Sequence, residues 1–367
     1  MAGSGMAALR EAAGAAGKLA AEEHEGLRYE RLVDDWHGLA RGTVFAAGIV
    51  IPGYPPIPRI LRLATGLAER FPGPFRVEEK IDGYNVRYAL VEGRLLGFSR
   101  GGFVCPFATD RGPELFDPAV LEEAPSRVLC AELAGPGNPY NIGRPPDPVA
   151  DVALYAFDLL ATDGSGFLPA GELDALAAAG AVRRARLLGR HTAADVAALR
   201  TLLHRLDAER REGVVFKEDG PQGRRAKYTT ARVTVDDLRV TGAELLDLPP
   251  WYFTGRLLRL ALFVDEEGLP RERLAAEMGT ALLEGMLDAV AQVRDHGRVE
   301  HAFRCRFRAR ANAERFAAML RGRAAVQVLV DGIEPDAEGY HVLRFRRVYP
   351  AMTGLLANVL RGGAIED

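Results

Sequence analysis

The sequence is poor in cysteine. Its 367 residues include only Cys105, Cys130 and Cys305, which lie far apart and are odd in number. This spacing excludes a disulfide framework and a Cys-x-x-Cys zinc site. His296 and His301 stand near Cys305, but the three match no zinc spacing, so we expect no structural zinc.

Long apolar runs and an excess of positive charge are also missing. No stretch approaches the roughly 18 to 20 apolar residues of a membrane span. The Ala/Gly-rich start up to Ala21 has no basic segment followed by an apolar core. We therefore expect a cytoplasmic protein with no membrane partner. The net charge is −3, so any contact with nucleic acid must come from local patches.

The chain is long enough for two or three domains, with 48% hydrophobic and 26% charged residues. Helices are expected at 59–70, 171–188, 193–211 and 269–294, after a helical or partly ordered leader up to about residue 40. Strand patterns cover 43–51, 75–81, 86–91, 95–99, 128–133, 152–160, 213–217 and 225–230. The strands and helices do not alternate as regular βαβ units, which favours the α+β class.

A lysine followed by a turn stands between two of these strands, in Lys80-Ile81-Asp82-Gly83. By itself this pattern is more often a surface β-turn than a reactive site. An ordinary lysine has a pKa of about 10.4, so little of it is the neutral amine that attacks an electrophile. A reactive Lys80 therefore needs neighbours that lower its pKa.

Further polar motifs fall at or beside the ends of the later strands. In chain order they are Ser99-Arg100-Gly101-Gly102, Ala131-Glu132-Leu133, Tyr155-Ala156-Phe157-Asp158, Glu212-Gly213-Val214-Val215-Phe216-Lys217 and Arg225-Ala226-Lys227-Tyr228. With Lys80, this ordered set resembles the nucleotidyltransferase motifs of covalent ligases and mRNA-capping enzymes. Each motif alone is weak, and their common order makes the resemblance specific.

The resemblance extends to one family within that superfamily. Residues 49–55, 79–87 and 226–230, with Asp247-Leu248-Pro249 and Tyr252-Phe253, are similar to the archaeal-type ATP-dependent RNA ligases, which also occur in some bacteria. Nearly everything after about residue 40 is covered. Asn85 strengthens the resemblance, because DNA ligases and capping enzymes commonly carry arginine there. No Arg-x-Asp-Lys tail motif of those relatives follows Lys227.

The resemblance implies that Lys80 attacks the α-phosphorus of ATP to form lysyl-AMP, which is resolved on an RNA 5′-phosphate. Lys217, Lys227, Arg100 and a bound metal are cations that would lower the pKa of Lys80 and neutralise phosphate charge. Lys80, Lys217 and Lys227 are the expected catalytic residues. The first lysine of the usual last motif is replaced by Arg225, so Lys227 is the safer assignment there.

The same resemblance implies roles for the other motif residues. Glu132 would bind the ribose, Phe157 would stack on adenine, and Glu212 would help to hold Mg²⁺ or Mn²⁺. Arg87 and Arg100 would hold the ATP tail or the RNA 5′-phosphate. The full set of expected ATP contacts is Glu79, Lys80, Ile81, Asn85, Arg87, Arg100, Glu132, Phe157, Val215, Lys217 and Lys227. Purely structural explanations stay open for two of these residues. Phe157 could pack in the core, and Glu212 could be a carboxylate without a role in the site.

These patterns predict four regions. An N-terminal leader and accessory segment covers 1–74, and a catalytic domain of antiparallel sheets and helices, an ATP-grasp-like ligase fold, covers 75–241. A helical region at 242–298 and a small α+β domain at 299–367 follow. A loop rich in Pro, Gly and Asn at 135–148 could lie over a ligand.

Two weaker patterns lie outside the motifs. An expected strand at 301–310 places Phe303, Cys305, Phe307 and Ala309 on one face and Arg304, Arg306, Arg308 and Arg310 on the other. Acidic neighbours are a commoner explanation of such arginines than RNA contact. The family resemblance implies a homodimer through the helical region, where Leu274, Met278, Leu282, Met286 and Leu287 form an apolar stripe that burial within one chain would equally explain.

The sequence therefore predicts an ATP-dependent RNA ligase acting on single-stranded RNA with 5′-phosphate and 3′-hydroxyl ends. Two alternatives remain. The same covalent chemistry could serve nicked DNA or capping, which Asn85 disfavours. The chain could also be a non-catalytic RNA-binding protein on a ligase fold, which the complete set of motifs disfavours.

Overall fold

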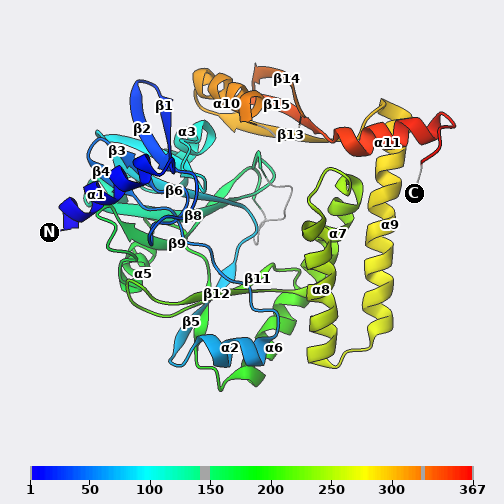
Figure 1. Cartoon of the computed structure of the whole chain (residues 1–367), viewed down its shortest axis with the longest axis horizontal. Helices are drawn as coiled ribbons and strands as arrows, with labels where there is room; N and C mark the ends of the chain where they lie inside the picture. The colour runs from blue at the N-terminus through cyan, green and yellow to red at the C-terminus, as the bar shows by residue number, and fades with distance from the viewer. Residues whose placement is uncertain (1, 141–148, 324–326, 366–367) are drawn as a thin grey trace.

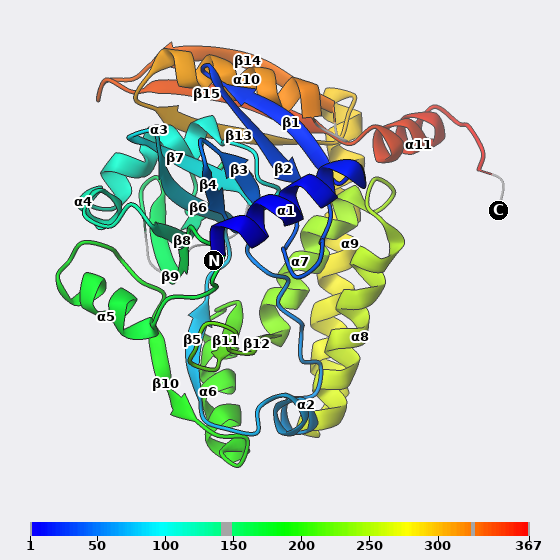
Figure 2. The same cartoon turned by 60° about the vertical axis from the view of Figure 1, so that its left-hand side comes forward.

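The computed structural model describes residues 2–140, 149–323 and 327–365. Its strands form four antiparallel sheets, with most helices packed on the outside (Figure 1). Both views place β13–β15 with α10 at one end of the molecule and α2 with α6 at the opposite end (Figures 1 and 2). The α+β prediction is confirmed. No helix within the described stretches has the length and apolar character needed to cross a bilayer.

The N-terminal part is more ordered than we expected. Helix α1 (Ala2–Ala15) precedes a four-stranded sheet. Its strands are β1 (Leu19–His24), β2 (Leu27–Leu32), β3 (Val44–Ala46) and β4 (Ile49–Ile51). The leader is therefore partly a hairpin, which turns at Glu25 and Gly26 with positive φ angles of 50° and 80°. The expected strand at 43–51 is two strands joined by a second tight turn.

Two central sheets face each other. The short segment 81–83, directly after Lys80, connects β5 of one sheet to β6 of the other. The first has the order β7-β6-β8-β9 and the second the order β10-β5-β11-β12. The first consists of β6 (Tyr84–Val91), β7 (Arg94–Ser99), β8 (Arg127–Ala134) and β9 (Ala153–Ala161), and the second of β5 (Phe75–Lys80), β10 (Leu187–His191), β11 (Gly213–Lys217) and β12 (Arg225–Thr229). Every expected strand from 75 to 230 is confirmed to within about two residues, and β10 is an addition.

Three of the helices around these sheets are shorter than the sequence suggested, and two others were not expected. The shorter ones are α2 (Leu63–Arg70), α5 (Ala170–Ala178) and α6 (Val196–Ala208), and the additions are α3 (Pro106–Leu115) and α4 (Ala119–Glu122). The helix expected at 171–188 stops near Gly180, and its last residues join β10 at a sheet edge. The helix expected from Arg59 begins only at Leu63, because Arg59 forms a parallel bridge with Lys227.

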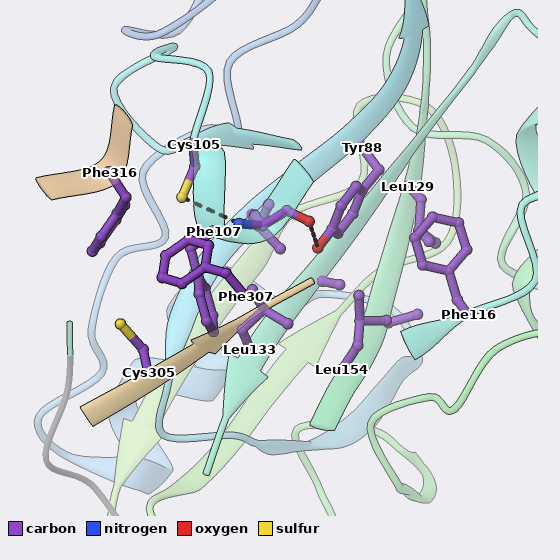
Figure 3. Close-up of a cluster of buried hydrophobic side chains, with 14 of the residues drawn as sticks. Tyr88, Cys105, Phe107, Phe116, Leu129, Leu133, Leu154, Cys305, Phe307 and Phe316 are labelled. Carbon is purple, nitrogen blue, oxygen red and sulfur yellow. Dashed lines mark hydrogen bonds between the residues drawn. The ribbon is translucent and has the colours of Figure 1, made fainter. Parts of the chain in front are cut away.

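The first central sheet is buried on both faces. One face packs on the N-terminal sheet through Ala89, Phe98 and Cys130. The other packs on α3 and on the C-terminal sheet, where Phe107 and Phe307 meet edge to face with ring centres 5.4 Å apart (Figure 3). The three cysteines are buried and free, in agreement with the expected lack of disulfides.

The helical region consists of α7 (Ala231–Glu244), α8 (Pro250–Glu267) and α9 (Arg271–His296). Leu274 and Met278 of α9 pack against the core beneath the second central sheet. Part of the predicted apolar stripe is therefore buried within the chain. Leu283 and Leu287 remain 59% and 57% exposed on the same helix.

The C-terminal sheet has the order β13-β15-β14. It is formed by β13 (Glu300–Phe307), β14 (Gln327–Pro335) and β15 (His341–Val348), with helices α10 (Arg310–Arg323) and α11 (Pro350–Leu360). The arginine-bearing strand ends at Phe307, so Arg308 and Arg310 lie beyond it. Arg306 pairs with Asp336 and Glu338, Arg308 with Glu114, and Arg310 with Glu314. These ion pairs favour the explanation by acidic neighbours.

Candidate active site

Lys80 is the last residue of β5, and its backbone lies opposite Gly213 of β11. This register brings the Lys80 ammonium to the Glu212 carboxylate, with 2.6 Å from Nζ to the oxygen. Gly213 has a φ of 142°, a conformation that favours glycine, and a Cβ there would lie 2.0 Å from the Tyr228 carbonyl. Glycine thus lets β11 pass close to β12 at the residue after Glu212.

Strand alternation gives the second central sheet one polar face and one apolar face. The polar face carries Lys80 with alternate residues of the three paired strands, namely Arg76, Glu78, Val215, Lys217, Arg225 and Lys227. The opposite face buries Val77, Val214, Phe216, Ala226 and Tyr228 against helices. The charged residues of the predicted site therefore point toward the first central sheet.

The first central sheet contributes Asn85 and Glu132, which are direct neighbours on β6 and β8. The turn after Lys80 presses on this sheet: a Cβ at Gly83 would stand 2.3 Å from the Leu133 carbonyl oxygen and 3.0 Å from the Glu132 side chain. Glycine at this turn lets Lys80 and Glu132 share one site. The buried Oδ1 of Asn85 has no hydrogen-bond partner among the described residues.

Three carboxylates dominate the electrostatics of Lys80. Burial favours the neutral amine, but Glu212, Glu132 and Asp82 outweigh it and raise the pKa of Lys80. We expected nearby cations to lower this pKa, and the carboxylates prevail instead. The pKa of the Glu132 carboxyl is also shifted. Burial raises it to about 8, the negative charge of Glu212 acts in the same direction, and the positive charge of Lys80 acts against them.

Lys227 is the lysine whose pKa is depressed. Burial lowers it to about 8, with further contributions from the positive charges of Arg59, Lys80 and Arg100. Arg100 is exposed on the turn after β7, within electrostatic reach of both Lys227 and Glu132. The structure thus brings Lys80, Arg100, Glu132, Glu212 and Lys227 into one cluster.

Lys217 lies deeper and is already fully engaged. Its ammonium contacts Glu78 at 2.8 Å and Asp158 at 3.2 Å, and it donates to the Phe157 carbonyl at 2.6 Å. Phe157 is the extra residue of a bulge in β9, because Cys130 pairs with Asp158 while the next residue pairs with Ala156. Its ring meets Tyr54 edge to face at 5.1 Å. Lys217 therefore fixes the bulge that carries Phe157.

Arg225 occupies the position where the related ligases usually carry the first lysine of the last motif. Its guanidinium contacts Asp158 at 3.2 Å, donates to the Gly223 carbonyl at 2.7 Å and lies over the Phe167 ring. These contacts hold the side chain away from Lys80. Lys227 is the member of this motif that joins the cluster.

Arg87 is placed differently from our prediction. Its side chain is fully buried beneath the N-terminal sheet and donates to the backbone carbonyls of Pro52, Gly42 and Ser99. Burial lowers its pKa to about 10. With its donors directed at three carbonyls, Arg87 stabilises the loop beside Arg100, and this placement disagrees with a phosphate-binding role.

Three other predicted ATP contacts lie near Lys80. Glu79 and Ile81 are its neighbours in the chain, and Val215 lies on the adjacent strand β11. Glu79 points to the opposite face of β5 and is 3.0 Å from Arg186 and 3.5 Å from Arg211. Ile81 packs against Tyr155 in a small apolar cluster. Val215 is partly exposed on the polar face. Glu79 therefore reaches the site only through its backbone.

Sequence reasoning missed a group of residues from outside the motifs. Arg59 precedes α2, Asp237 lies on α7, and Arg256 and Arg259 lie on α8. Glu212 influences the pKa of Arg59, Asp237 and Arg259, so all three lie within reach of the cluster. Only the convergence of distant segments reveals them, because no local pattern distinguishes these arginines from surface ones.

Few side chains in the site could serve as metal ligands. Within the described part of the chain, no group of three or more His, Cys, Asp or Glu side chains is arranged to hold a metal ion. Mg²⁺ commonly takes one or two carboxylates and completes its shell with water and substrate phosphates. The clustered carboxylates of Glu212 and Glu132 fit that mode.

Comparisons with known proteins agree with this geometry. A family described as RNA ligase matches residues 73–229, and one described as the ligase Pab1020 C-terminal region matches 240–363. An Aquifex aeolicus protein provisionally described as an ATP-dependent DNA ligase is 40% identical over 98% of this chain and 100% of its own, with a TM-score of 0.93. The chain belongs to the RNA ligase family.

Two further relatives extend the likeness. The archaeal ATP-dependent RNA ligase, solved in two forms, is 28% and 27% identical to this RNA ligase family member, with TM-scores of 0.87. These likenesses cover 97% of the chain and 95% and 96% of theirs. An uncharacterized Methanocaldococcus jannaschii protein is 24% identical over 82% of the chain and 78% of its own length. Membership places the chain among ATP-dependent polynucleotide ligases.

Proposed function

We propose that this protein is an ATP-dependent RNA ligase that joins a 5′-phosphate to a 3′-hydroxyl on single-stranded RNA. The observation that carries the proposal is the convergence of Lys80, Glu132, Glu212 and Lys227 between two sheets. The motif order and the likeness to archaeal RNA ligases over almost the whole chain support it. We further propose that it acts in the cytoplasm, which suits its three free, buried cysteines.

In the first step the neutral amine of Lys80 attacks the α-phosphorus of ATP. A nitrogen–phosphorus bond forms, the bond to the bridging oxygen breaks, and pyrophosphate leaves. Lys227 offsets the charge that develops on the phosphoryl oxygens. Glu132 holds the ribose and Phe157 the adenine, while Lys217 keeps the bulge of Phe157 in place.

The next two steps use the stored AMP. An oxygen of the RNA 5′-phosphate attacks the phosphorus of lysyl-AMP, and Lys80 leaves as an amine that takes up a proton. The RNA 3′-hydroxyl then attacks the activated 5′-phosphate, a phosphodiester forms and AMP leaves. Glu212 would hold Mg²⁺ or Mn²⁺, which would weaken the attraction of this carboxylate for the Lys80 proton and offset phosphate charge.

The first test is covalent labelling. The protein is incubated with labelled ATP or GTP and Mg²⁺, and an acid-labile, alkali-stable adduct is sought, with Lys80→Ala as the control. We expect label from ATP in the wild type and none in the variant. Labelling by neither nucleotide would refute the enzyme and leave an RNA-binding protein, and labelling only by GTP would indicate a capping enzyme.

A second candidate is a DNA ligase, which the Aquifex aeolicus relative favours. The substrate test compares 5′-phosphorylated single-stranded RNA with nicked duplex DNA at equal concentrations of labelled enzyme. We expect joining or circularisation of the RNA. Sealing of the DNA alone would overturn the proposal in favour of the DNA ligase.

We also propose a homodimer through the helical region. Leu283 and Leu287 lie one turn apart on α9 and are more than half exposed. Both are spaced to lie on one side of the helix. The side that carries Ala281, Gly285 and Ala289 is buried against the rest of the chain, so the two leucines are available for a second copy.

A further inference from the structure

We propose that Arg59, Lys227 and Arg259 form a binding subsite for a phosphate group, beside Lys80 and separate from the nucleoside contacts. This inference rests on the proposed function, because it concerns a phosphate of the same reaction. The three residues come from the N-terminal segment, the catalytic sheet and helix α8, so no single motif contains the subsite. They are called the three-cation subsite below.

The backbone fixes the first two members. Residues 58–60 run parallel to β12: the Lys227 amide donates to the Pro58 carbonyl at 2.9 Å, and the Ile60 amide donates to the Lys227 carbonyl at 2.8 Å. The Arg59 guanidinium donates to the Thr229 hydroxyl. That hydroxyl lies on the same strand as Lys227, two residues away, so both side chains share the polar face.

Helix α8 brings the third member. Arg259 donates only a long hydrogen bond, 3.4 Å, to the Gly255 carbonyl of its own helix. Burial lowers its pKa to about 10, and the charges of Arg59 and Arg256 act in the same direction. Arg59 has its own pKa lowered by burial and by Arg256, against Glu212 and Asp237. The segment that follows Arg59 is fixed to the same helix, because Arg62 pairs with Asp265 at 2.9 Å and the Leu63 amide donates to Glu266 at 2.7 Å.

The nearby carboxylates are already used by other cations. Glu212 is paired with Lys80 at 2.6 Å, and Asp237 is paired with Arg256 at 3.1 Å. Among the described residues, no carboxylate lies within ion-pair distance of Arg59, Lys227 or Arg259. Three half-buried cations with no carboxylate in direct contact favour the binding of an anion, since buried charge is costly when unpaired.

A phosphate group is the anion whose chemistry fits. Two guanidinium groups and an ammonium offer several donors to tetrahedral phosphate oxygens, and guanidinium binds such oxygens bidentately. In the proposed reaction this phosphate is either the β,γ-phosphates of ATP, which leave as pyrophosphate, or the 5′-phosphate of the RNA. Both are phosphate groups that must lie close to Lys80.

Binding is tested with inorganic pyrophosphate as the probe. The melting temperature is measured with and without pyrophosphate for the wild type, Arg59→Met, Arg259→Met and the double variant. We expect the stabilisation of the wild type to fall in each variant and to vanish in the double one. Arg271→Met, which alters an arginine 86% exposed at the start of α9, is the matched control and should behave as the wild type.

Stability without ligand separates a subsite from a structural role. Because Arg259 has no ion pair to lose, Arg259→Met should leave the ligand-free melting temperature unchanged or raised. A marked fall would mean that the arginine holds the fold, and an equal pyrophosphate effect in the variants and the wild type would overturn the subsite. Neither outcome depends on ligase activity, so failure of the proposed function would be seen separately in the labelling test.

Activity then identifies the source of the phosphate. Three assays are compared for each variant. They are lysyl-AMP formation from ATP, joining of 5′-phosphorylated RNA by preformed lysyl-AMP enzyme, and sealing of RNA that already carries the 5′-AMP. Loss of a charge-assisted contact should slow the affected step about 10- to 100-fold. Loss in the first assay assigns the subsite to the ATP tail, and loss only in joining of 5′-phosphorylated RNA by preformed lysyl-AMP enzyme assigns it to the RNA end. No loss in any assay would overturn a role in the reaction.

Discussion

The ammonium of Lys80 and the carboxylate of Glu212 are joined by a 2.6 Å ion pair. The pairing follows from sheet register, since Lys80 lies opposite Gly213. Glu212 is one of the carboxylates that raise the pKa of Lys80 above its ordinary value. The carboxylates around the nucleophile thus favour its protonated form.

Replacing Glu212 should change the pH dependence of the first step. In Glu212→Gln the ion pair is lost, so the pKa of Lys80 falls and the neutral amine appears at lower pH. We expect a lower maximal rate of lysyl-AMP formation, because a proposed metal ligand is gone, with the midpoint of the pH–rate profile shifted to lower pH. Glu209→Gln, at an exposed carboxylate that pairs with other residues, should keep the wild-type midpoint. A midpoint in Glu212→Gln that equals the wild type would contradict the interpretation.

Binding of ATP should be coupled to proton uptake through Lys227. Its pKa is about 8 in the free protein, and a phosphate beside it would favour the charged form and raise that pKa. Between pH 8 and 9.5 we therefore expect net uptake of a proton, measured by calorimetry in buffers of different ionisation enthalpy. Lys227→Met should abolish this uptake, whereas Arg271→Met should retain it.

The same group affects stability with a defined sign. The pKa of Lys227 is lower in the folded protein than in the unfolded chain, so the unfolded state binds more protons between about pH 8 and 10.5. Its contribution to the free energy of unfolding therefore increases as pH rises through this window. In Lys227→Met this increase should be smaller, measured by urea denaturation at several pH values. An identical pH dependence in both proteins would argue against the depressed pKa.

Arg87 should matter for folding rather than for catalysis. Arg87→Met removes the hydrogen bonds that this side chain donates to three backbone carbonyls beneath the N-terminal sheet, which should lower the free energy of unfolding by roughly 2 to 4 kcal/mol. The KM for ATP at a temperature where the variant is folded should change little. Arg28→Met, at an exposed arginine of β2, is the control. A stable variant with a strongly raised KM would restore the phosphate-binding role.

The oligomeric state tests the exposed face of α9. We expect the wild type to have a mass in light scattering near twice the 39.8 kDa of one chain. The double variant Leu283→Glu/Leu287→Glu should be monomeric with an unchanged helix content, because charge is introduced where apolar surface would be covered. Glu272→Lys at the exposed start of α9 should stay dimeric. A monomeric wild type would refute the dimer.

Much of the fold was readable because its strands obey a simple alternation. The residues of β11 and β12 alternate between the buried core and the polar face, and a local pattern was sufficient there. The hairpin of β1 and β2 was missed because its alanine-rich first strand resembles a helix. Strand β10 was missed because an edge strand with a bulge shows little periodicity.

The site divides in the same way. Lys80, Glu132, Glu212 and Lys227 stand in recognisable motifs, and the structure brings them together. Arg87 also stands in a motif, but its burial depends on packing with the N-terminal sheet, which no local pattern reveals. Arg59 and Arg259 are placed only by long-range contacts. The burial of Arg87 and its hydrogen bonds to distant backbone carbonyls exist only in the folded chain, so the sequence alone could not reveal them.

Residues 58–60 run parallel to the outer side of β12 and are bound to it by two backbone hydrogen bonds around the bridge between Arg59 and Lys227. A fragment that starts at residue 73, where the match to the RNA ligase family begins, lacks this run. Its β12 would present open backbone donors and acceptors, which invite pairing between molecules. We therefore expect such a fragment to self-associate, and a minimal version should retain residues 58–60 to remain dispersed.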